Sequence, residues 1–365
     1  MKKVDYLVTA KCEALYEYAN SVMAKYEDYL DSESALDCIK NIYDDLCDYN
    51  TKILLCDSIE RYELLLKNIK EFDSIIKHVS DSDNVGCLIM NYSEAEFDKA
   101  YKKIIRRIIK FKSPVNNPMA YILGGQPGAG KTGLQRNLMV ENSNIIIINA
   151  DAYRNSHPRF NEIQAEFGTL AQRHTQPFIN EVVEKLISHL SDMKYSLVIE
   201  GTLRTAEIPL NTCRMLKNKG YSVELHIISV KKEISYESTI YRYENNLELG
   251  MVPRATAKED HDNVVDAICD NLDIIYEQNA FDDIKLFDRE GNNLYTAKCG
   301  VAPSLVEKDK LFGYWSDSEI TSYRKIIDDI IALKRSRNAP DLAKYILESS
   351  IKFAYAKSRI EKLNK

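Results

Sequence analysis

The chain has 365 residues, of which 45 % are apolar and 28 % are charged, and its net charge is −6 at pH 7. This apolar content allows a large core and excludes a disordered chain, and the length favours about two domains. No apolar run reaches the roughly 18–20 residues of a membrane span, and the charged start lacks the apolar stretch of a signal peptide, so we expect a soluble cytosolic protein.

The first 80 residues predict an acidic helical bundle. They contain 10 Lys and Arg against 16 Asp and Glu, so the whole net charge lies there. They lack Gly and Pro, and apolar residues such as Tyr62, Leu65 and Ile69 recur at helical spacing. We predict three or four helices with a break near residues 31–34. The negative charge argues against nucleic acid as a partner.

A polar linker is predicted at residues 81–89, and the pattern then changes to a larger domain over residues 90–365. An amphipathic helix is expected at 93–112. Its basic part could bind an anionic membrane, but it leads directly into a strand, which favours a packing helix. Strands are expected at 120–124, 144–150, 195–201, 221–230 and 283–287. Helices are expected at 131–140, 161–192, 206–219, 232–248 and 257–278.

This alternation of strand and helix predicts an α/β fold, a mostly parallel sheet flanked by helices on both faces. The bundle of residues 1–80 precedes it as a small all-α part. Residues 302–365 are helical and charged and carry no recognisable chemical motif.

A phosphate-binding P-loop is the strongest motif, because it follows a predicted strand and opens a predicted helix. Its residues are Gly125, Gln126, Pro127, Gly128, Ala129, Gly130, Lys131 and Thr132. The glycines let the backbone turn its N–H groups toward phosphate oxygens, and the helix N-terminus favours the same anion. We expect Lys131 to reach the β- and γ-phosphates of ATP and Thr132 to ligate Mg²⁺.

Two carboxylates stand where predicted strands end, which is where ligands of open α/β sheets bind. Asp151 could take the proton of an acceptor hydroxyl, or it could cap the next helix. Glu200 ends a buried strand, where an acid needs a partner such as a substrate hydroxyl or an arginine. Thr202 and Arg204 follow and offer a hydroxyl and a fork of donors.

Two arginines flank a Gly- and Pro-containing loop, in the manner of a small-molecule kinase lid. Arg242 lies in a predicted helix and Arg254 in the loop after it. Positive charge there could stabilise a phosphoryl group in transfer. Taken singly, each arginine is more often a solvated surface charge, and Glu184 on an earlier helix reads as a surface acid.

From about residue 90 to 300 the chain resembles the zeta-toxin family of bacterial kinases. The resemblance rests on motifs in the family's order: PMAYILGGQPGAGKTGL, INADAYRNSHPRF, SLVIEGTLRT, STIYRYE, RATAKEDHDNVV and DIKLFDREG. It implies an ATP- and Mg²⁺-dependent, cytoplasmic enzyme that phosphorylates the 3′-hydroxyl of the amino sugar in UDP-N-acetylglucosamine.

The resemblance also implies roles for single residues. Asp151 would be the catalytic base, with Lys131, Arg242 and Arg254 binding phosphates. The residues that would surround the sugar nucleotide are Asp151, Glu184, Glu200, Thr202 and Arg204. Leu203, where a small residue is expected, and Ala150, where a polar one is frequent, depart from the pattern and could alter the acceptor pocket.

Residues 1–80 are similar in size and helical layout to epsilon, the separate antitoxin of this family. We therefore expect an antitoxin-like domain that restrains the kinase in cis, since an acidic module can compete for phosphate-binding cations. The alternatives are a plain helical extension, a kinase for another nucleotide sugar or small molecule, and a catalytically silent toxin–antitoxin binding scaffold.

Overall fold

The computed structural model describes residues 6–30, 37–80, 92–168, 171–251 and 253–360. The chain divides into two compact units, Met1–Met119 with Gln135–Glu200 and Ala120–Leu134 with Gly201–Lys365. The linker predicted at 81–89 and the helix break predicted at 31–34 lie outside the described residues. The domain boundaries drawn from the sequence stay a prediction.

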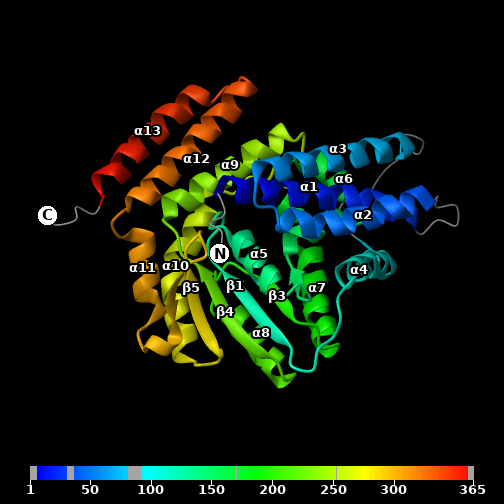
Figure 1. The fold of residues 1–365 in the computed structure, drawn as a ribbon, viewed down its shortest axis with the longest axis horizontal. Coiled ribbons are helices and arrows are strands. Elements are labelled where there is room, and N and C mark those ends of the chain that lie inside the picture. Colours follow the sequence, from blue (N-terminus) through cyan, green and yellow to red (C-terminus); the bar gives the residue numbers. More distant parts are fainter. Residues whose placement is uncertain (1–5, 31–36, 81–91, 169–170, 252, 361–365) are drawn as a thin grey trace. The chain divides into compact units, whose positions relative to one another are not determined.

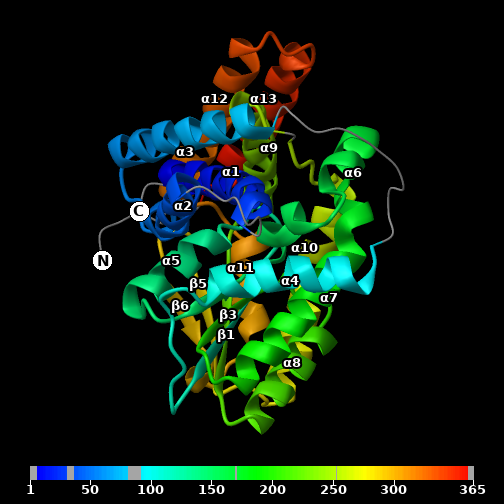
Figure 2. The same cartoon turned by 90° about the vertical axis from the view of Figure 1, so that its right-hand side faces the viewer.

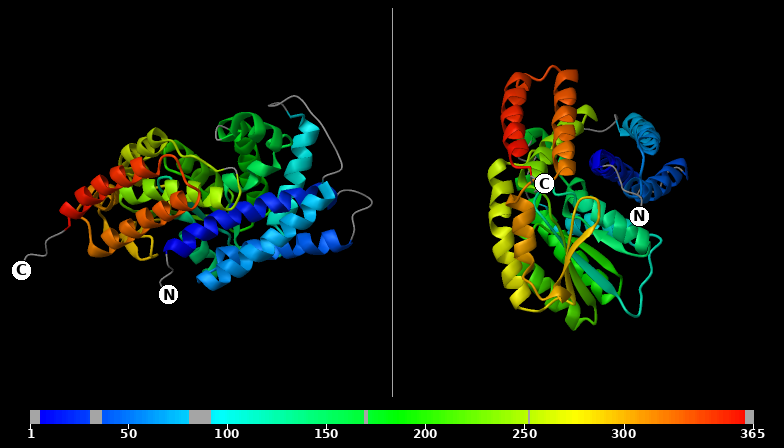
Figure 3. Two further views of the ribbon diagram at one scale, coloured as in Figure 1. Left: turned by 90° about the horizontal axis from the view of Figure 1, so that it is seen from above. Right: turned by 60° about the vertical axis from the view of Figure 1, so that its left-hand side comes forward.

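Three helices, α1 (Tyr6–Leu30), α2 (Asp37–Leu54) and α3 (Ile59–Ser80), lie side by side in the first unit (Figure 1; Figure 3). Along α1, apolar residues recur every three or four positions, so they form one buried face. Leu15 and Met23 are fully buried there, as are Leu46 of α2 and Ile69 of α3. The predicted N-terminal helical bundle is confirmed.

The rest of the first unit joins helices to two parallel strands. It contains α4 (Glu94–Ile108), most of α5 (Lys131–Glu141), β2 (Ile146–Ile148), the 3-10 helix η1 (Ala150–Ser156), α6 (Phe160–Phe167), α7 (Ala171–Asp192) and β3 (Leu197–Glu200). Ile147 of β2 pairs with Val198 of β3. Figure 2 shows α4 beside α7, where Phe97 packs edge-on against Phe178 at 5.6 Å between ring centroids.

The single helix predicted at 161–192 is wrong, because α6 and α7 are separate helices. Gly168 ends α6 with a φ of 53°, a left-handed backbone that glycine adopts easily and that stops a helix. The strand predicted at 144–150 is also shorter than expected, since its last residue already belongs to η1.

The second unit contains the remaining strands and the C-terminal helices. They are β1 (Met119–Gly124), the start of α5, α8 (Glu207–Asn218), β4 (Ser222–Ile228), α9 (Lys232–Glu248), α10 (Lys258–Glu277), β5 (Asp283–Phe287), β6 (Asn293–Thr296), η3 (Ala297–Cys299), α11 (Pro303–Phe312), α12 (Asp317–Ser336) and α13 (Leu342–Ser358). The unpredicted strand β6 pairs antiparallel with β5. Helices α12 and α13 form a hairpin beside α9 (Figure 2; Figure 3).

The six strands form one sheet in the order β2-β3-β1-β4-β5-β6. The pairs β2–β3 and β4–β5 are parallel, and the sheet is flanked by many helices. The predicted mostly parallel α/β fold is confirmed. Among the helices described, none has the length and apolar character needed to span a membrane.

Candidate active site

The P-loop connects β1 to α5 within the second unit, and its glycines are required by geometry. Gly125, Gly128 and Gly130 have φ of 135°, 75° and 104°. A Cβ on Gly128 would lie 2.1 Å from the backbone oxygen of Ser235 in α9. A side chain at Gly128 would therefore displace the loop. The three glycines allow the loop backbone to form the concave, N–H-lined surface that binds a phosphate chain.

Two side chains fasten the P-loop. Gln126 is fully buried, and its Nε2 donates to the Val230 carbonyl at 3.1 Å and to Ser235 Oγ at 3.2 Å. Arg289 donates from Nε to the Ala129 carbonyl at 3.0 Å and from Nη2 to the Gly128 carbonyl. In a trans peptide the carbonyl and the following N–H point in opposite directions, so the Gly130 N–H points away from Arg289.

Arg289 was missed in the sequence, although a signal existed. It stands two residues after the end of β5, where the strand-end rule places ligand-binding residues in such sheets. Its side chain also donates to Ser238 Oγ of α9 at 2.9 Å. One guanidinium thus joins the P-loop to α9.

Lys131 and Thr132 are the first two residues of α5, as predicted. Lys131 is 8 % exposed, and its ammonium donates to the carbonyl of Gly125 at 2.9 Å and, more weakly, of Gln126 at 3.4 Å. The ammonium therefore lies over the loop, where a phosphate oxygen can replace the carbonyls. The glycine cradle, the lysine and the helix N-terminus together fit a nucleotide polyphosphate, and the Thr132 hydroxyl at the same helix start fits its Mg²⁺.

The two predicted arginines both lie in the second unit. Arg242 of α9 donates from Nη2 to Thr256 Oγ1 at 3.3 Å, and Thr256 lies in the segment that joins α9 to α10. Arg254 is half-buried in that same segment. A side chain of α9 is thereby bonded to the connecting segment that carries the second arginine.

Thr202 and Arg204 are exposed, and Arg204 lies 3.8 Å from Asp260. Leu203 between them has a φ of 57° and is buried. Its side chain packs at the end of β1, since a Cβ on Gly124 would lie 2.5 Å from Leu203 Cδ1. The unexpected leucine therefore faces the core of the second unit.

Asp151 lies in η1 of the first unit, just beyond β2. Asn149 caps η1 by accepting from the Asp151 N–H at 3.0 Å, so the alternative that Asp151 is the cap is wrong. The Asp151 carboxylate, about one-third exposed, accepts from Arg154 Nε at 2.9 Å. Arg154 is held in turn by Thr175 Oγ1 at 3.0 Å and Gln176 Oε1 at 2.8 Å.

Arg154 was not predicted, because its role depends on the 3-10 geometry of η1. In that helix residues three apart are nearly eclipsed, which brings Arg154 onto Asp151.

Of the other acids, Glu200 at the end of β3 accepts from Gln135 Nε2 at 2.6 Å. Glu184 is exposed on α7, in agreement with its interpretation as a surface acid.

The N-terminal bundle packs against the segment that carries Asp151. Helix α1 lies along η1, and Glu27 of α1 pairs with Arg107 of α4 at 3.4 Å. Both side chains are nearly fully buried, 3 % and 6 % exposed, and Tyr43 of α2 donates to Glu27 at 2.9 Å. A buried charge pair of this kind fixes the arrangement of α1 on α4, because breaking it strands a charge.

Further contacts join helices α1–α3 to the rest of the first unit. Arg136 of α5 donates to the Cys56 carbonyl between α2 and α3, and Lys110 pairs with Asp44. Burial raises the pKa of the Tyr16 phenol on α1, while the charge of Arg107 lowers it and that of Glu200 raises it further.

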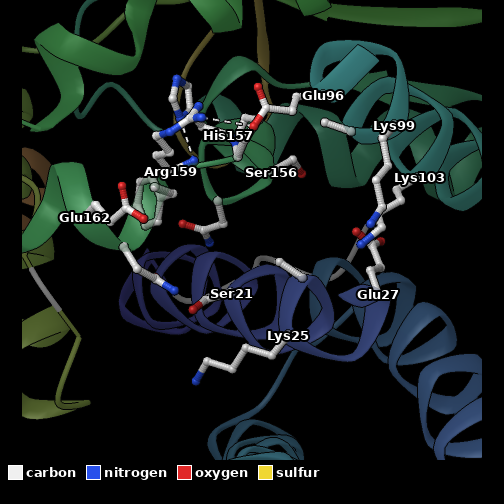
Figure 4. A pocket seen from close by; sticks show the side chains of 16 residues that line it. Ser21, Lys25, Glu27, Glu96, Lys99, Lys103, Ser156, His157, Arg159 and Glu162 are labelled. Carbon is white, nitrogen blue, oxygen red and sulfur yellow. Dashed lines mark hydrogen bonds and ion pairs between the residues drawn. The ribbon is translucent and has the colours of Figure 1, made fainter. Parts of the chain in front are cut away.

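Figure 4 shows a cavity of about 370 Å³ between α1, α4 and the segment around the end of η1. Ser21 of α1 and Lys99 of α4 line it together with residues that follow η1. His157 and Arg159 stand on that side, and Arg159 pairs with Glu96 at 3.1 Å. Burial lowers the pKa of His157 to about 4, so the ring is neutral at pH 7.

A family model described as zeta toxin matches residues 102–299, more than half of the chain. The chain belongs to the zeta toxin family. It is 39 % identical over 237 residues to Toxin PezT of Streptococcus pneumoniae, covering 63 % of this chain and 92 % of that protein. It is 35 % identical over 257 residues to Toxin zeta of Streptococcus pyogenes, covering 69 % and 90 %.

A solved structure from the PezAT chromosomal toxin–antitoxin system of Streptococcus pneumoniae has the same fold, with a TM-score of 0.64 and 35 % identity. The alignment covers 68 % of this chain and 100 % of that one. Helices α1–α3 precede the zeta toxin segment and α11–α13 follow it. The P-loop, Asp151, Arg242 and Arg254 all lie inside it.

Proposed function

We propose that the chain is the kinase toxin of a toxin–antitoxin system, which moves the γ-phosphoryl group of ATP to the 3′-hydroxyl of UDP-N-acetylglucosamine. The observation that supports it most is the glycine-built P-loop with Lys131 at the start of α5, in a chain of the zeta toxin family. A chain that had lost its kinase activity would have no need of an ordered P-loop, yet Gln126 and Arg289 hydrogen-bond this loop in place from two sides.

In this proposal the second unit binds the nucleotide. Backbone N–H groups of the P-loop and the Lys131 ammonium would hold the phosphates, and the Thr132 hydroxyl would hold the Mg²⁺, which would supply positive charge there. Arg242 and Arg254 bind the phosphoryl group as its charge redistributes. Arg289 keeps the loop carbonyls turned away from that anion.

The acceptor is activated by the carboxylate of Asp151, which Arg154 orients. As the sugar oxygen forms its bond to the γ-phosphorus, the bond from that phosphorus to the β–γ bridging oxygen breaks, ADP leaves, and the proton of the sugar hydroxyl passes to Asp151. Glu200, Thr202 and Arg204 bind the nucleotide sugar, together with Glu184 in the family's pattern. The sugar itself rests on the family resemblance, and other nucleotide sugars are the second candidate acceptors.

We also propose that helices α1–α3 restrain this activity in cis. The support is the packing of α1 along η1, which carries Asp151. The similar structure comes from a system described as toxin and antitoxin, so an inhibitory partner fits the family. Since the helices belong to the chain, even weak docking would occlude the acceptor side.

The test uses the full chain with ATP, Mg²⁺ and UDP-N-acetylglucosamine, and detects the sugar phosphate by mass. The variant Glu27→Gln strands the buried Arg107 charge and should weaken docking by about 3 kcal/mol, raising the rate of product formation at least tenfold. Lys52→Met, which removes an exposed pair within α2, is the matched control. Asp151→Ala should abolish product in every background.

Each other outcome has a definite meaning. Equal rates for wild type and Glu27→Gln would refute the restraint. ATP turnover without sugar phosphate would keep the kinase and refute this acceptor. Absence of both ATP binding and turnover, in wild type and Glu27→Gln alike, would favour the binding scaffold.

A further inference from the structure

Helix α9 buries two acids that the proposed chemistry does not use. Glu237 and Glu244 are each 1 % exposed. They are seven residues apart, two helical turns, and therefore lie on one face. Arg242, one of the proposed phosphate-binding arginines, stands between them in the sequence.

Both acids are held by the hairpin of α12 and α13, which lies beside α9 in Figures 2 and 3. Arg337 donates twice to Glu244, at 2.8 and 2.9 Å, and Lys334 lies 2.7 Å from the same carboxylate. Tyr345 donates to Glu237 at 2.8 Å and Lys352 at 3.0 Å. The four residues that make these contacts, Lys334, Arg337, Tyr345 and Lys352, all lie beyond residue 299, where the zeta toxin segment ends.

Other residues of α9 contact the P-loop. Ser235 accepts from Gln126 and its carbonyl stands against Gly128, while Ser238 accepts from Arg289. Helix α9 thus contacts the hairpin through Glu237 and Glu244, and it contacts the P-loop and Arg289 through Ser235 and Ser238. A shift of α9 would move Arg242 and the P-loop anchors together.

Buried ion pairs are a poor source of stability, because desolvation of the charges offsets most of their attraction. What they supply is one defined arrangement, since any shift leaves a buried charge unpaired. We infer that the α12–α13 hairpin is a positioning element, which sets α9 so that Arg242 meets the transferring phosphoryl group. The inference rests on the proposed kinase function.

The hairpin also faces the loop that joins α9 to α10. A cavity of about 560 Å³ is lined by Ala255 and Thr256 of the loop and by Arg337 and Pro340 of the hairpin. The loop segment that carries Arg254 borders this space. Thr256 accepts the hydrogen bond from Arg242, so a change in the hairpin can reach Arg242 through α9 or through this loop, and hydrogen exchange in α9 tests the first route.

A double-mutant cycle tests this in the full chain carrying Glu27→Gln. Arg337→Gln should lower kcat about tenfold with little change in KM for ATP. Combined with Arg242→Ala it should cause no further loss. Lys344→Gln, at an exposed pair of the same hairpin, should leave kcat unchanged.

Amide hydrogen exchange gives a readout that does not need the kinase reaction. Arg337→Gln should speed exchange in residues 232–248 and leave residues 258–277 of α10 unchanged. Equal losses of kcat from Arg337→Gln with and without Arg242 would overturn the inference. So would unchanged exchange in α9, even if the chain proved to have no kinase activity.

Discussion

Asp151 owes its orientation to a residue three positions further along η1. Arg154 binds the carboxylate and is itself fixed by two side chains of α7. A general base works only if its lone pair is aimed at the proton it removes, so the support is as important as the base.

We expect Arg154→Met to lower kcat by about 10- to 100-fold while KM for ATP stays the same, because only the acceptor side is disturbed. Steady-state kinetics in the Glu27→Gln background measure both constants. Arg159→Met, which removes the neighbouring pair with Glu96, is the control. A loss confined to KM for ATP would show that Arg154 serves the nucleotide instead.

Glu307 of α11 is a fully buried carboxyl whose Oε2 accepts from Ser229 Oγ. Burial raises its pKa from 4.5 to about 7, against a smaller lowering by the Ser229 bond. The folded state therefore keeps a proton that the unfolded state releases near pH 4.5. The contribution of Glu307 to the free energy of unfolding is therefore largest below that pH, and it falls as the pH rises to about 7.

Glu307→Gln removes this ionisation and keeps the acceptor oxygen for Ser229. We expect the difference in free energy of unfolding, variant minus wild type, to rise by about 3 kcal/mol between pH 4.5 and pH 8. Urea unfolding at the two values measures it, and other titrating groups cancel in the difference. A constant difference would mean that Glu307 is ionised throughout.

At the scale of elements, local patterns in the sequence predicted most of the fold. The P-loop, the strands and the flanking helices depend on residues within about ten positions of one another, so spacing alone reveals them. The break between α6 and α7 was missed because one glycine, Gly168, decides it. Short β6 was missed because its four residues carry little periodicity.

The contacts that complete the site could not be read from the sequence, because they join distant positions. Arg289 and Ala129 are 160 residues apart, Arg337 and Glu244 are 93 apart, and Arg107 and Glu27 are 80 apart. Each of these cations, seen alone, resembles an ordinary surface charge. Only tertiary packing distinguishes them.

The P-loop supplies a prediction at this scale. Gly128→Ala should abolish ATP binding, because the new methyl group would overlap the Ser235 carbonyl and the positive φ adds strain. Isothermal titration with ATP and Mg²⁺ measures the binding. Gly250→Ala, with a φ of 71° and open space around it, isolates the strain of positive φ and should keep the affinity within about twofold. Retained binding by Gly128→Ala would contradict the tight approach.

For the whole molecule, the packing of α1 on η1 predicts which substrate the restraint opposes. ATP with Mg²⁺ at about 100 times its Kd should stabilise the chain by about 2.7 kcal/mol, a rise of about 3.5 °C in Tm. The rise should be equal in wild type and Glu27→Gln, and absent in Lys131→Ala. A larger rise in Glu27→Gln would mean that the restraint also opposes the nucleotide.

The order of the parts along the chain has a consequence for synthesis. Helix α3 ends at Ser80, about 70 residues before Asp151, and ribosomes add roughly 5–20 residues per second. On our proposal, the bundle would leave the ribosome some 4–14 s before the catalytic base does. Each newly made kinase would then meet its inhibitor already folded, in a fixed ratio of one to one. Release would require an event in the finished protein, such as cleavage or displacement, rather than unequal production or decay of two separate proteins.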